Sequence, residues 1–207
     1  MKILFIQKQT FMFFGISALA GYLQERGHQV DVLIDGRERD LRSAIADCRP
    51  DLIGFSLLSN DYAWFLQRGA QVKAWYPALP LIAGGAHAWV CPEMIEQPWL
   101  DMVCVGEGEE PLHRLLTAGL APQQISGLLW KDASGGIHRN PLGTPVADLD
   151  TIREDRGVYV RRYPFFAQET LLQVISSRGC PLQCSFCLNS VVHARLAGKG
   201  PVYRRKS

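Results

Sequence analysis

The stretch Leu79-Pro-Leu-Ile-Ala-Gly-Gly-Ala-His87 is a short apolar run that ends in two adjacent glycines. An apolar run of this length between turn residues is typical of a strand that is buried on both faces of a sheet. The glycines lack a Cβ atom, so the backbone after this strand can approach a flat ligand closely. A glycine turn is also an ordinary chain reversal, so its meaning depends on the rest of the chain.

The same alternation of strand and helix signals extends on both sides of this stretch. We predict strands at residues 2–7, 29–34, 51–56, 79–83 and 102–105, and helices at residues 15–26, 41–48, 61–75, 92–97 and 109–116. This rhythm favours an α/β fold with a doubly wound, parallel, five-stranded sheet of the flavodoxin or Rossmann-like kind. Segments 125–131 and 136–140 then resemble a hairpin. Ligands of such sheets bind at the carboxyl ends of the strands.

Composition limits the classes of protein to which the chain can belong. Hydrophobic residues make up 47% of the chain, which is enough for a sizeable core. No apolar run approaches the roughly 18 residues of a membrane span. Met1-Lys2 leads directly into an apolar strand rather than a signal peptide. We therefore expect a cytoplasmic protein with no membrane span and no disulfide framework.

Three cysteines, Cys180, Cys184 and Cys187, lie in the run Ser-Arg-Gly-Cys-Pro-Leu-Gln-Cys-Ser-Phe-Cys. A [4Fe–4S] cluster is normally held by four thiolates, so a C-x3-C-x2-C triad leaves one iron open to a small molecule. The run resembles the signature of the radical S-adenosylmethionine (SAM) enzymes. The resemblance implies that the triad ligates a [4Fe–4S] cluster, that the open iron binds SAM, and that Phe186 packs near the adenine. It also implies an external reductant such as ferredoxin or flavodoxin.

A structural metal site is the alternative for these cysteines. Together with His193 they would make the Cys3His ligand set that zinc accepts. Zinc sites more often combine two C-x2-C pairs, and the chain has no second pair. Cys48, Cys91 and Cys104 lie in predicted helices or buried strands, so we interpret them as small apolar residues.

Small residues after the predicted strands form a second pattern. Gly15, the pair Ser56 and Leu58, and the pair Gly84 and Gly85 fall at spacings close to the D-x-H-x-x-G, S-x-L and G-G pattern of the cobalamin-binding domain family. The resemblance implies that the serine and the glycines line the slot for the nucleotide tail of cobalamin. The segments Leu-Gln-Glu-Arg-Gly-His (23–28) and Gly-Glu-Gly-Glu-Glu (106–110) also resemble those of cobalamin-binding radical SAM enzymes.

The chain departs from the cobalamin-binding pattern before Gly15. Thr10 stands at the aspartate position and Met12 at the histidine position, so the imidazole that ligates cobalt in other members of that family is missing. We interpret the apolar run 11–14 either as a dry floor under the corrin, which favours transfer of a methyl group to radicals, or as core between strand and helix. Met12 as a thioether ligand to cobalt is a further alternative.

His87 and the glutamates near residue 107 each have more than one interpretation. His87 follows the fourth predicted strand, where it either contacts the cofactor, ligates a metal, or bonds to backbone in a structural role. Glu107 and Glu109 stand at the start of a predicted helix, where carboxylates suit the positive end of the helix dipole. The resemblance places this loop near the cofactor or the second domain, so Glu107 is also a candidate contact to cobalamin.

Charge is distributed unevenly along the chain. Residues 151–207 carry ten Lys and Arg against three Asp and Glu, a net +7, so residues 1–150 carry −5 of the overall +2. The basic run Arg204-Arg205-Lys206 is a pattern that occurs in nucleic-acid-binding segments. We expect it instead to offset the charge of cluster sulfide and carboxylates, and we expect no nucleic acid partner.

The resemblances divide the chain into three parts. Residues 1–140 are expected to be a cobalamin-binding domain, 141–170 a linker, and 171–207 an N-terminal fragment of a radical SAM domain. In that fragment, a strand at 171–177 resembles the first strand of a partial TIM barrel and leads into the cysteine loop. Because few residues follow Cys187, we expect this chain to be incomplete for catalysis.

The function that the resemblance implies is that of a cobalamin-dependent radical SAM enzyme. Its [4Fe–4S] cluster would cleave SAM reductively, for methyl transfer to, or rearrangement at, an unactivated carbon. Two alternatives stay open. One is a non-catalytic cobalamin-binding module, and the other is a zinc-stabilised flavodoxin-like domain that binds no corrin.

Overall fold

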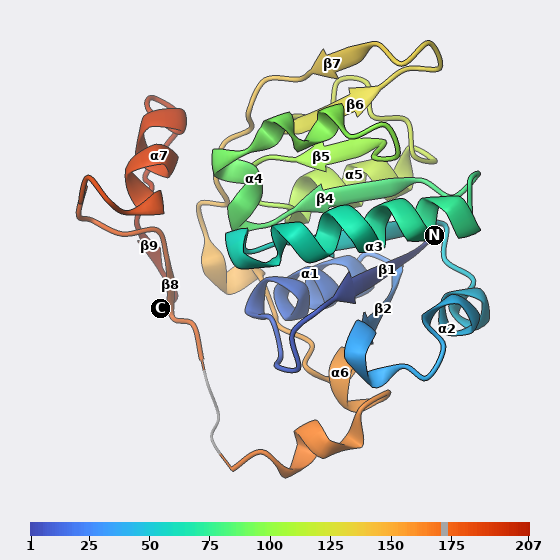
Figure 1. Cartoon of the computed structure of the whole chain (residues 1–207). Helices are drawn as coiled ribbons and strands as arrows, with labels where there is room; N and C mark the ends of the chain where they lie inside the picture. Colours follow the sequence, from blue (N-terminus) through green and yellow to red (C-terminus); the bar gives the residue numbers. More distant parts are fainter. Residues whose placement is uncertain (171–173) are drawn as a thin grey trace.

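The computed structural model describes residues 1–170 and 174–207, and its main feature is a seven-stranded sheet with the order β2-β1-β3-β4-β5-β6-β7 (Figure 1). The strands are β1 (Lys2–Gln7), β2 (Gln29–Ile34), β3 (Leu52–Ser56), β4 (Leu81–Gly84), β5 (Met102–Cys104), β6 (Leu128–Lys131) and β7 (Ile137–Arg139). Strands β1 to β5 pair in parallel, and β6 and β7 extend the sheet as an antiparallel hairpin. The order 2-1-3-4-5 is that of the flavodoxin-like doubly wound sheet, so the predicted fold class is confirmed.

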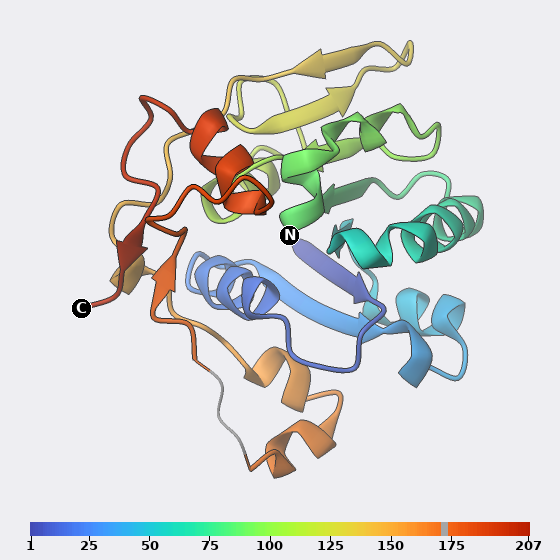
Figure 2. The ribbon, with the colours of Figure 1, turned by 60° about the vertical axis from the view of Figure 1, so that its left-hand side comes forward.

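Helices cover both faces of this sheet (Figures 1 and 2). The α-helices are α1 (Phe14–Gln24), α2 (Leu41–Cys48), α3 (Tyr62–Trp75), α4 (Ala86–Val90), α5 (Glu109–Thr117), α6 (Gly157–Val160) and α7 (Leu188–Arg195). Short 3-10 helices are η1 (Asp35–Arg37), η2 (Ser59–Asp61), η3 (Pro92–Glu96), η4 (Leu149–Thr151) and η5 (Pro164–Gln168). None of the helices within 1–170 and 174–207 is long and apolar enough to cross a membrane.

The sheet separates two apolar cores, as the continuous hydrophobic strands predict. Along β1, Leu4 and Ile6 pack with α2 and α3, whereas Ile3 and Phe5 pack with α1 and α5. One predicted helix differs from expectation: residues 92–96 form a 3-10 turn rather than an α-helix. Pro98 disfavours helical backbone at the residue before it, so too few residues remain for an α-helix.

The aromatic part of the expected linker packs against the first domain. Tyr159, Tyr163 and Phe166 are buried in the core on the α1 face. The Tyr159 hydroxyl donates to Gln7 Oε1 at 2.6 Å and accepts the Phe13 N–H at 3.1 Å. Buried tyrosines need such partners for their hydroxyl groups, and here those partners tie the segment to the sheet.

The predicted strand at 171–177 is corrected by the structure. Residues 171–173 lie outside the described residues, and 174–176 are not in a strand. A two-residue strand β8 (Ser177–Arg178) pairs antiparallel with β9 (Arg204–Arg205), and we call this pair the ribbon. Backbone polar groups need partners, and the chain that returns after α7 supplies them here in place of a parallel barrel strand. In Figure 2 the ribbon and α7 stand beside the sheet.

Candidate functional site

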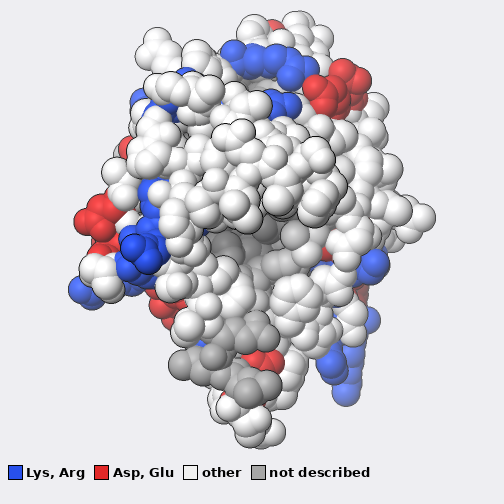
Figure 3. All heavy atoms as spheres, turned by 90° about the vertical axis from the view of Figure 1, so that its left-hand side faces the viewer, with Lys and Arg blue, Asp and Glu red and all other residues white. Residues whose placement is uncertain are grey.

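A cavity of about 690 Å³ lies at the carboxyl ends of the parallel strands. One wall comes from the first domain and contains the start of α1, the ends of β3 and β4, and the loop after β5. The opposite wall comes from α7 and the ribbon. Figure 3 shows this side of the molecule, where uncharged side chains occupy the centre and Lys and Arg gather toward the margin. The cavity is lined by both apolar and charged residues and lies at the position where doubly wound sheets bind ligands.

The turns after β3 and β4 are bonded to each other at this cavity. The Leu57 N–H donates to Gly84 O at 2.9 Å, and the His87 N–H donates to Leu57 O at 3.0 Å. Gly85 has φ 87° and ψ −168°, a conformation that is essentially restricted to glycine. A Cβ atom there would lie 2.7 Å from Leu57 N, so the two turns can approach only because residue 85 is glycine.

The predicted cofactor contacts divide into two groups in the structure. Those that line the cavity are Gly15, Ser56, Gly84, Gly85 and Glu107. Those absent from its lining are Met12, Leu58, His87 and Phe186. Met12 packs against the α1-side core, Leu58 is surface-exposed, and Phe186 is 92% exposed.

His87 is buried on the other side of the glycine turn. Its Nδ1 lies 3.0 Å from Ser59 Oγ, and its ring packs on Tyr62 with 4.5 Å between centroids. Burial lowers the pKa of the His87 imidazole. The side chain therefore bonds to a hydroxyl group rather than to the backbone acceptor that the sequence suggested.

The loop that stands in place of the missing histidine is held by residues that the sequence did not point to. Gln7 is 1% exposed, and its side-chain amide donates to Gln9 O and to Phe11 O, the latter at 2.8 Å. Gln9 Nε2 donates to the buried Asp61 at 2.8 Å. Together with Tyr159, these bonds fix residues 8–13 in one conformation. A buried glutamine within an apolar strand is the one signal that could have indicated this loop.

The cysteine triad lies on a loop between the ribbon and α7. All three thiols are free and half-buried. The Leu182 N–H donates to Cys180 Sγ at 3.4 Å, and Asn189 Nδ2 donates to Cys187 Sγ at 3.7 Å. Among the described residues, no three His, Cys, Asp or Glu side chains converge as a ligand group.

Two further groups bear on metal binding near this site. His193 Nε2 lies 2.6 Å from Cys180 O, so this ring nitrogen bonds to the backbone and does not join the triad. Cys104 lines the cavity, but burial, together with the charge of Glu109, raises the pKa of its thiol to about 12. It is therefore protonated, which agrees with its interpretation as a small apolar residue.

The loop after β5 carries the charged part of the cavity wall. Glu107 pairs with Arg204, with Oε1 2.7 Å from Nη2 and Oε2 3.0 Å from Nη1. Glu109 pairs with Arg178. Burial alone would raise the pKa of Glu107, but bonds from Arg204 and the charge of Arg178 outweigh it, and the pKa is lowered. The sequence led us to expect that the basic run containing Arg204 would offset carboxylate charge, but it named no partner and did not point to Arg178, because nothing in their spacing indicates a partner about 70 or more residues away.

Comparisons with known proteins show what the chain is similar to. A family model described as the B12 binding domain matches residues 9–116. The chain is 28% identical over 188 residues to the anaerobic magnesium-protoporphyrin IX monomethyl ester cyclase of Rubrivivax gelatinosus, covering 83% of this chain and 34% of the relative. It is 23% identical to the cytidylyl-2-hydroxyethylphosphonate methyltransferase of Streptomyces wedmorensis, covering 84% and 43%.

A solved structure shares the fold. The cobalamin-dependent S-adenosylmethionine radical enzyme OxsB, with aqua-cobalamin and S-adenosylmethionine bound, superposes with a TM-score of 0.69 at 20% identity. The match covers 90% of this chain and 28% of that chain. The chain thus spans about a third of the length of the first curated relatives that it matches.

Proposed function

Because the chain belongs to the B12 binding domain family, whose model matches residues 9–116, we propose that it binds cobalamin in the cavity at the carboxyl edge of its sheet and carries a SAM-cleaving cluster on the opposite wall. In this proposal residues 1–140 form the corrin-binding part and 171–207 belong to the radical SAM part. The observation that carries it is the cavity itself, which has the glycine turns on one wall and the segment after the cysteine loop on the other.

The residues of the cavity suit a corrin. Gly84 and Gly85 leave backbone without side chains at the wall, and Ser56 adds a hydroxyl group beside them. Such a mixture of apolar surface with a few fixed polar groups is typical of cofactor sites. Ser56, Gly84 and Gly85 would hold the nucleotide tail, whereas the bonded loop 8–13 lies outside the lining of the cavity. That loop contains no imidazole, so this segment would supply no histidine ligand to cobalt.

The triad suits an iron–sulfur cluster by the chemistry of its donors. Three reduced, half-buried thiols stand within eight residues, and two N–H groups point to their sulfurs. Cys180, Cys184 and Cys187 would bind three irons, and Phe186 would cover the adenine of SAM. When bound, the cluster and cobalamin would supply electron transfer to SAM and carriage of a methyl group, respectively.

The reaction class follows from these groups and from the names of the relatives, which include methyltransferases and cyclases. We propose methyl transfer to, or rearrangement at, an unactivated carbon, with an external reductant such as ferredoxin or flavodoxin. This chain would contribute the corrin site and the cluster ligands to that activity.

Binding of hydroxocobalamin tests the first half of the proposal. Gly84→Leu should abolish retention of the corrin through gel filtration, because the added side chain enters the cavity. Gly36→Leu is the matched control: Gly36 lies outside the cavity lining, and open space surrounds its Cβ position. Failure of the unmodified chain to retain any corrin would refute the cobalamin site.

Anaerobic reconstitution with iron and sulfide tests the second half. We expect about four irons per chain and a broad visible absorption that Cys184→Ala removes. Cys91→Ala is the matched control, since Cys91 is a half-buried cysteine outside the loop. Stoichiometric zinc in place of iron would overturn the cluster. Corrin binding without any cluster would favour the non-catalytic module.

A further inference from the structure

The ribbon places two positive charges directly opposite each other. Arg178 on β8 and Arg204 on β9 are cross-strand partners, so their side chains leave the same face of the ribbon. Like charges in such a pair repel, and the ribbon has only two residues in each strand. Pairing of β8 with β9 therefore depends on groups that neutralise both guanidinium ions.

Glu107 is the residue that meets both arginines. Its Oε1 lies 2.7 Å from Arg204 Nη2 and 3.5 Å from Arg178 Nη1. Its Oε2 accepts the Val146 N–H at 2.7 Å, while Arg204 Nη1 donates to Val146 O at 2.6 Å. A single carboxylate thus joins the ribbon, the loop after β5 and the chain at residue 146.

Glu109 completes the charge balance. Its side chain is 3% exposed and pairs with Arg178, and its Oε2 has no hydrogen-bond partner among the described residues. Loss of Arg178 would leave this carboxylate buried and without compensation, which is costly. The two glutamates and two arginines, which we call the clasp, therefore depend on one another.

The clasp is connected to the first cysteine by one residue. Gly179 has φ +77°, and a Cβ atom there would lie 2.1 Å from Val202 O. The chain between Arg178 and Cys180 is thus pressed against residues 202–203, which come directly before the strand that carries Arg204. Because only Gly179 separates Arg178 from Cys180, ion pairs that hold the Arg178 side chain also restrict the position of Cys180 at the start of the cysteine loop.

We propose that the clasp of Glu107, Glu109, Arg178 and Arg204 positions the cysteine loop at the mouth of the cavity. Glu107 and Glu109 are positioning residues that act on Cys180 through Arg178, and they set the place of the cluster relative to the corrin. This role rests on the proposed function, in which the triad holds a cluster and the cavity holds cobalamin.

The first test uses the chain without cofactors, so that it is independent of the proposed function. The amide of Lys206, directly after the ribbon, bonds to Ser176 O at 2.8 Å. In Glu107→Gln this amide should exchange with deuterium about tenfold faster or more, because bonds to a charged group are lost. Amides of β3 should keep their exchange rates. Arg204→Gln should reproduce this result.

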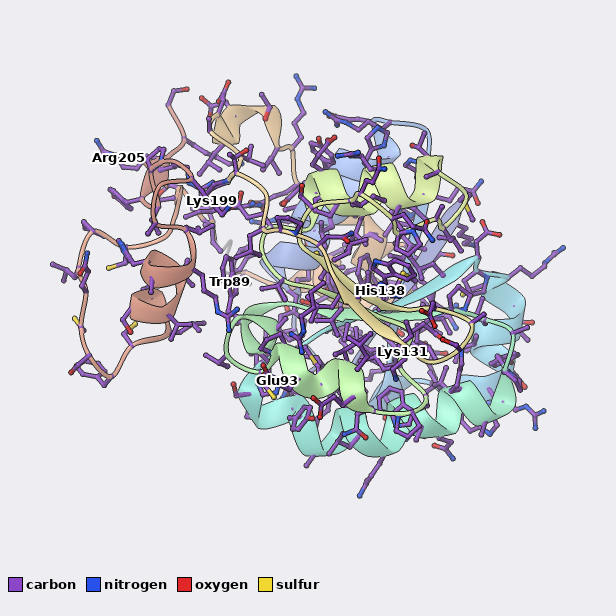
Figure 4. The ribbon with its side chains drawn as sticks, turned by 90° about the horizontal axis from the view of Figure 1, so that it is seen from above. Trp89, Glu93, Lys131, His138, Lys199 and Arg205 are labelled. Atoms are coloured by element: carbon purple, nitrogen blue, oxygen red, sulfur yellow. The ribbon has the colours of Figure 1, made fainter. Side chains whose placement is uncertain are left out.

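A matched control lies next to the clasp. Arg205 follows Arg204 on the same strand, is exposed, and lies at the outer margin of the C-terminal segment (Figure 4). Arg205→Gln should leave exchange of the ribbon unchanged. The charge swap Glu107→Arg with Arg204→Glu should recover part of the protection that each single change removes, which a merely bulky structural role would not permit.

The second test uses the reconstituted chain. Glu107→Gln should lose iron to a chelator about tenfold faster than the unmodified chain or Arg205→Gln, since the loop is no longer held. Unchanged exchange and unchanged iron loss in Glu107→Gln would overturn the clasp while leaving cluster binding intact. Absence of a cluster in every variant, with faster ribbon exchange in Glu107→Gln, would instead refute the proposed function and leave the clasp standing.

Discussion

Replacement by alanine should have different effects at Gly84 and Gly85, two adjacent glycines at the cavity. At Gly84 a Cβ atom would meet Cys104 O at 3.4 Å, which is ordinary contact, and Gly84 ends β4 with no positive φ. At Gly85 a Cβ atom would lie 2.7 Å from Leu57 N and 2.9 Å from Leu57 O, and φ is 87°. Gly84→Ala should therefore alter the wall of the cavity, whereas Gly85→Ala should lower the stability of the fold.

The structure sets the size of each effect. Gly84→Ala should alter the free energy of unfolding by less than about 1 kcal/mol, because the new residue fits and also restricts the unfolded chain. Gly85→Ala should cost about 1–3 kcal/mol from the glycine-only conformation, and more from contact with backbone that cannot move aside. For a chain of this length, a loss of about 1–3 kcal/mol corresponds to a Tm lower by roughly 2–12 °C.

Thermal unfolding and hydroxocobalamin titration together check this contrast. Gly84→Ala should keep its Tm and weaken corrin binding by about tenfold, which is about 1.4 kcal/mol. In Gly85→Ala the main effect should be a lower Tm. Corrin affinity that is unchanged in Gly84→Ala would refute the placement of the cofactor against this wall, and an unchanged Tm in Gly85→Ala would refute the argument from backbone conformation.

Three further changes probe the neighbouring segments. Tyr159→Phe should cost about 1–3 kcal/mol in urea unfolding, because Gln7 loses a buried donor. The pKa of His87 is lowered in the folded chain, so the unfolded chain binds more protons near and below pH 6.5. The free energy of unfolding should therefore fall as the pH drops through that value. His87→Gln should make the free energy of unfolding depend less on pH in this range. Gly179→Ala, whose Cβ would strike Val202, should reduce iron retained after reconstitution without moving the main unfolding transition, and full iron loading would contradict this.

The fold was predictable because its signals are local. Apolar runs such as 79–83 and amphipathic segments such as 109–116 report burial directly, and strand–helix alternation restricts the topology to few choices. The residues Ser56, Gly84 and Gly85 were predictable for the same reason. They stand at strand ends, and the carboxyl ends of parallel strands share one edge of a sheet.

The rest of the site depends on contacts that no local pattern encodes. Tyr159 binds Gln7 across 152 positions, and Arg204 binds Glu107 across 97. In a sequence, a tyrosine in an expected linker and an arginine in a basic run look alike whether their side chains are solvated or buried. His87 shows the converse, since its position after a strand left a cofactor contact open beside a structural role, while in the structure its side chain contacts Ser59 and Tyr62 and does not line the cavity.

Charge is the property through which the sequence did indicate these distant contacts. The first 150 residues carry −5 and the remainder +7, and ion pairs join the two parts: Arg153 with Glu25, Arg162 with Glu38, Arg178 with Glu109, and Arg204 with Glu107. The basic run at the C-terminus is not a continuous exposed patch, since Arg204 is buried and Lys206 Nζ donates to Ile152 O at 3.0 Å. The positive segment is matched to carboxylates of the sheet domain, so an electrostatic imbalance between two parts of one chain predicts that they dock, although it does not predict which residues meet.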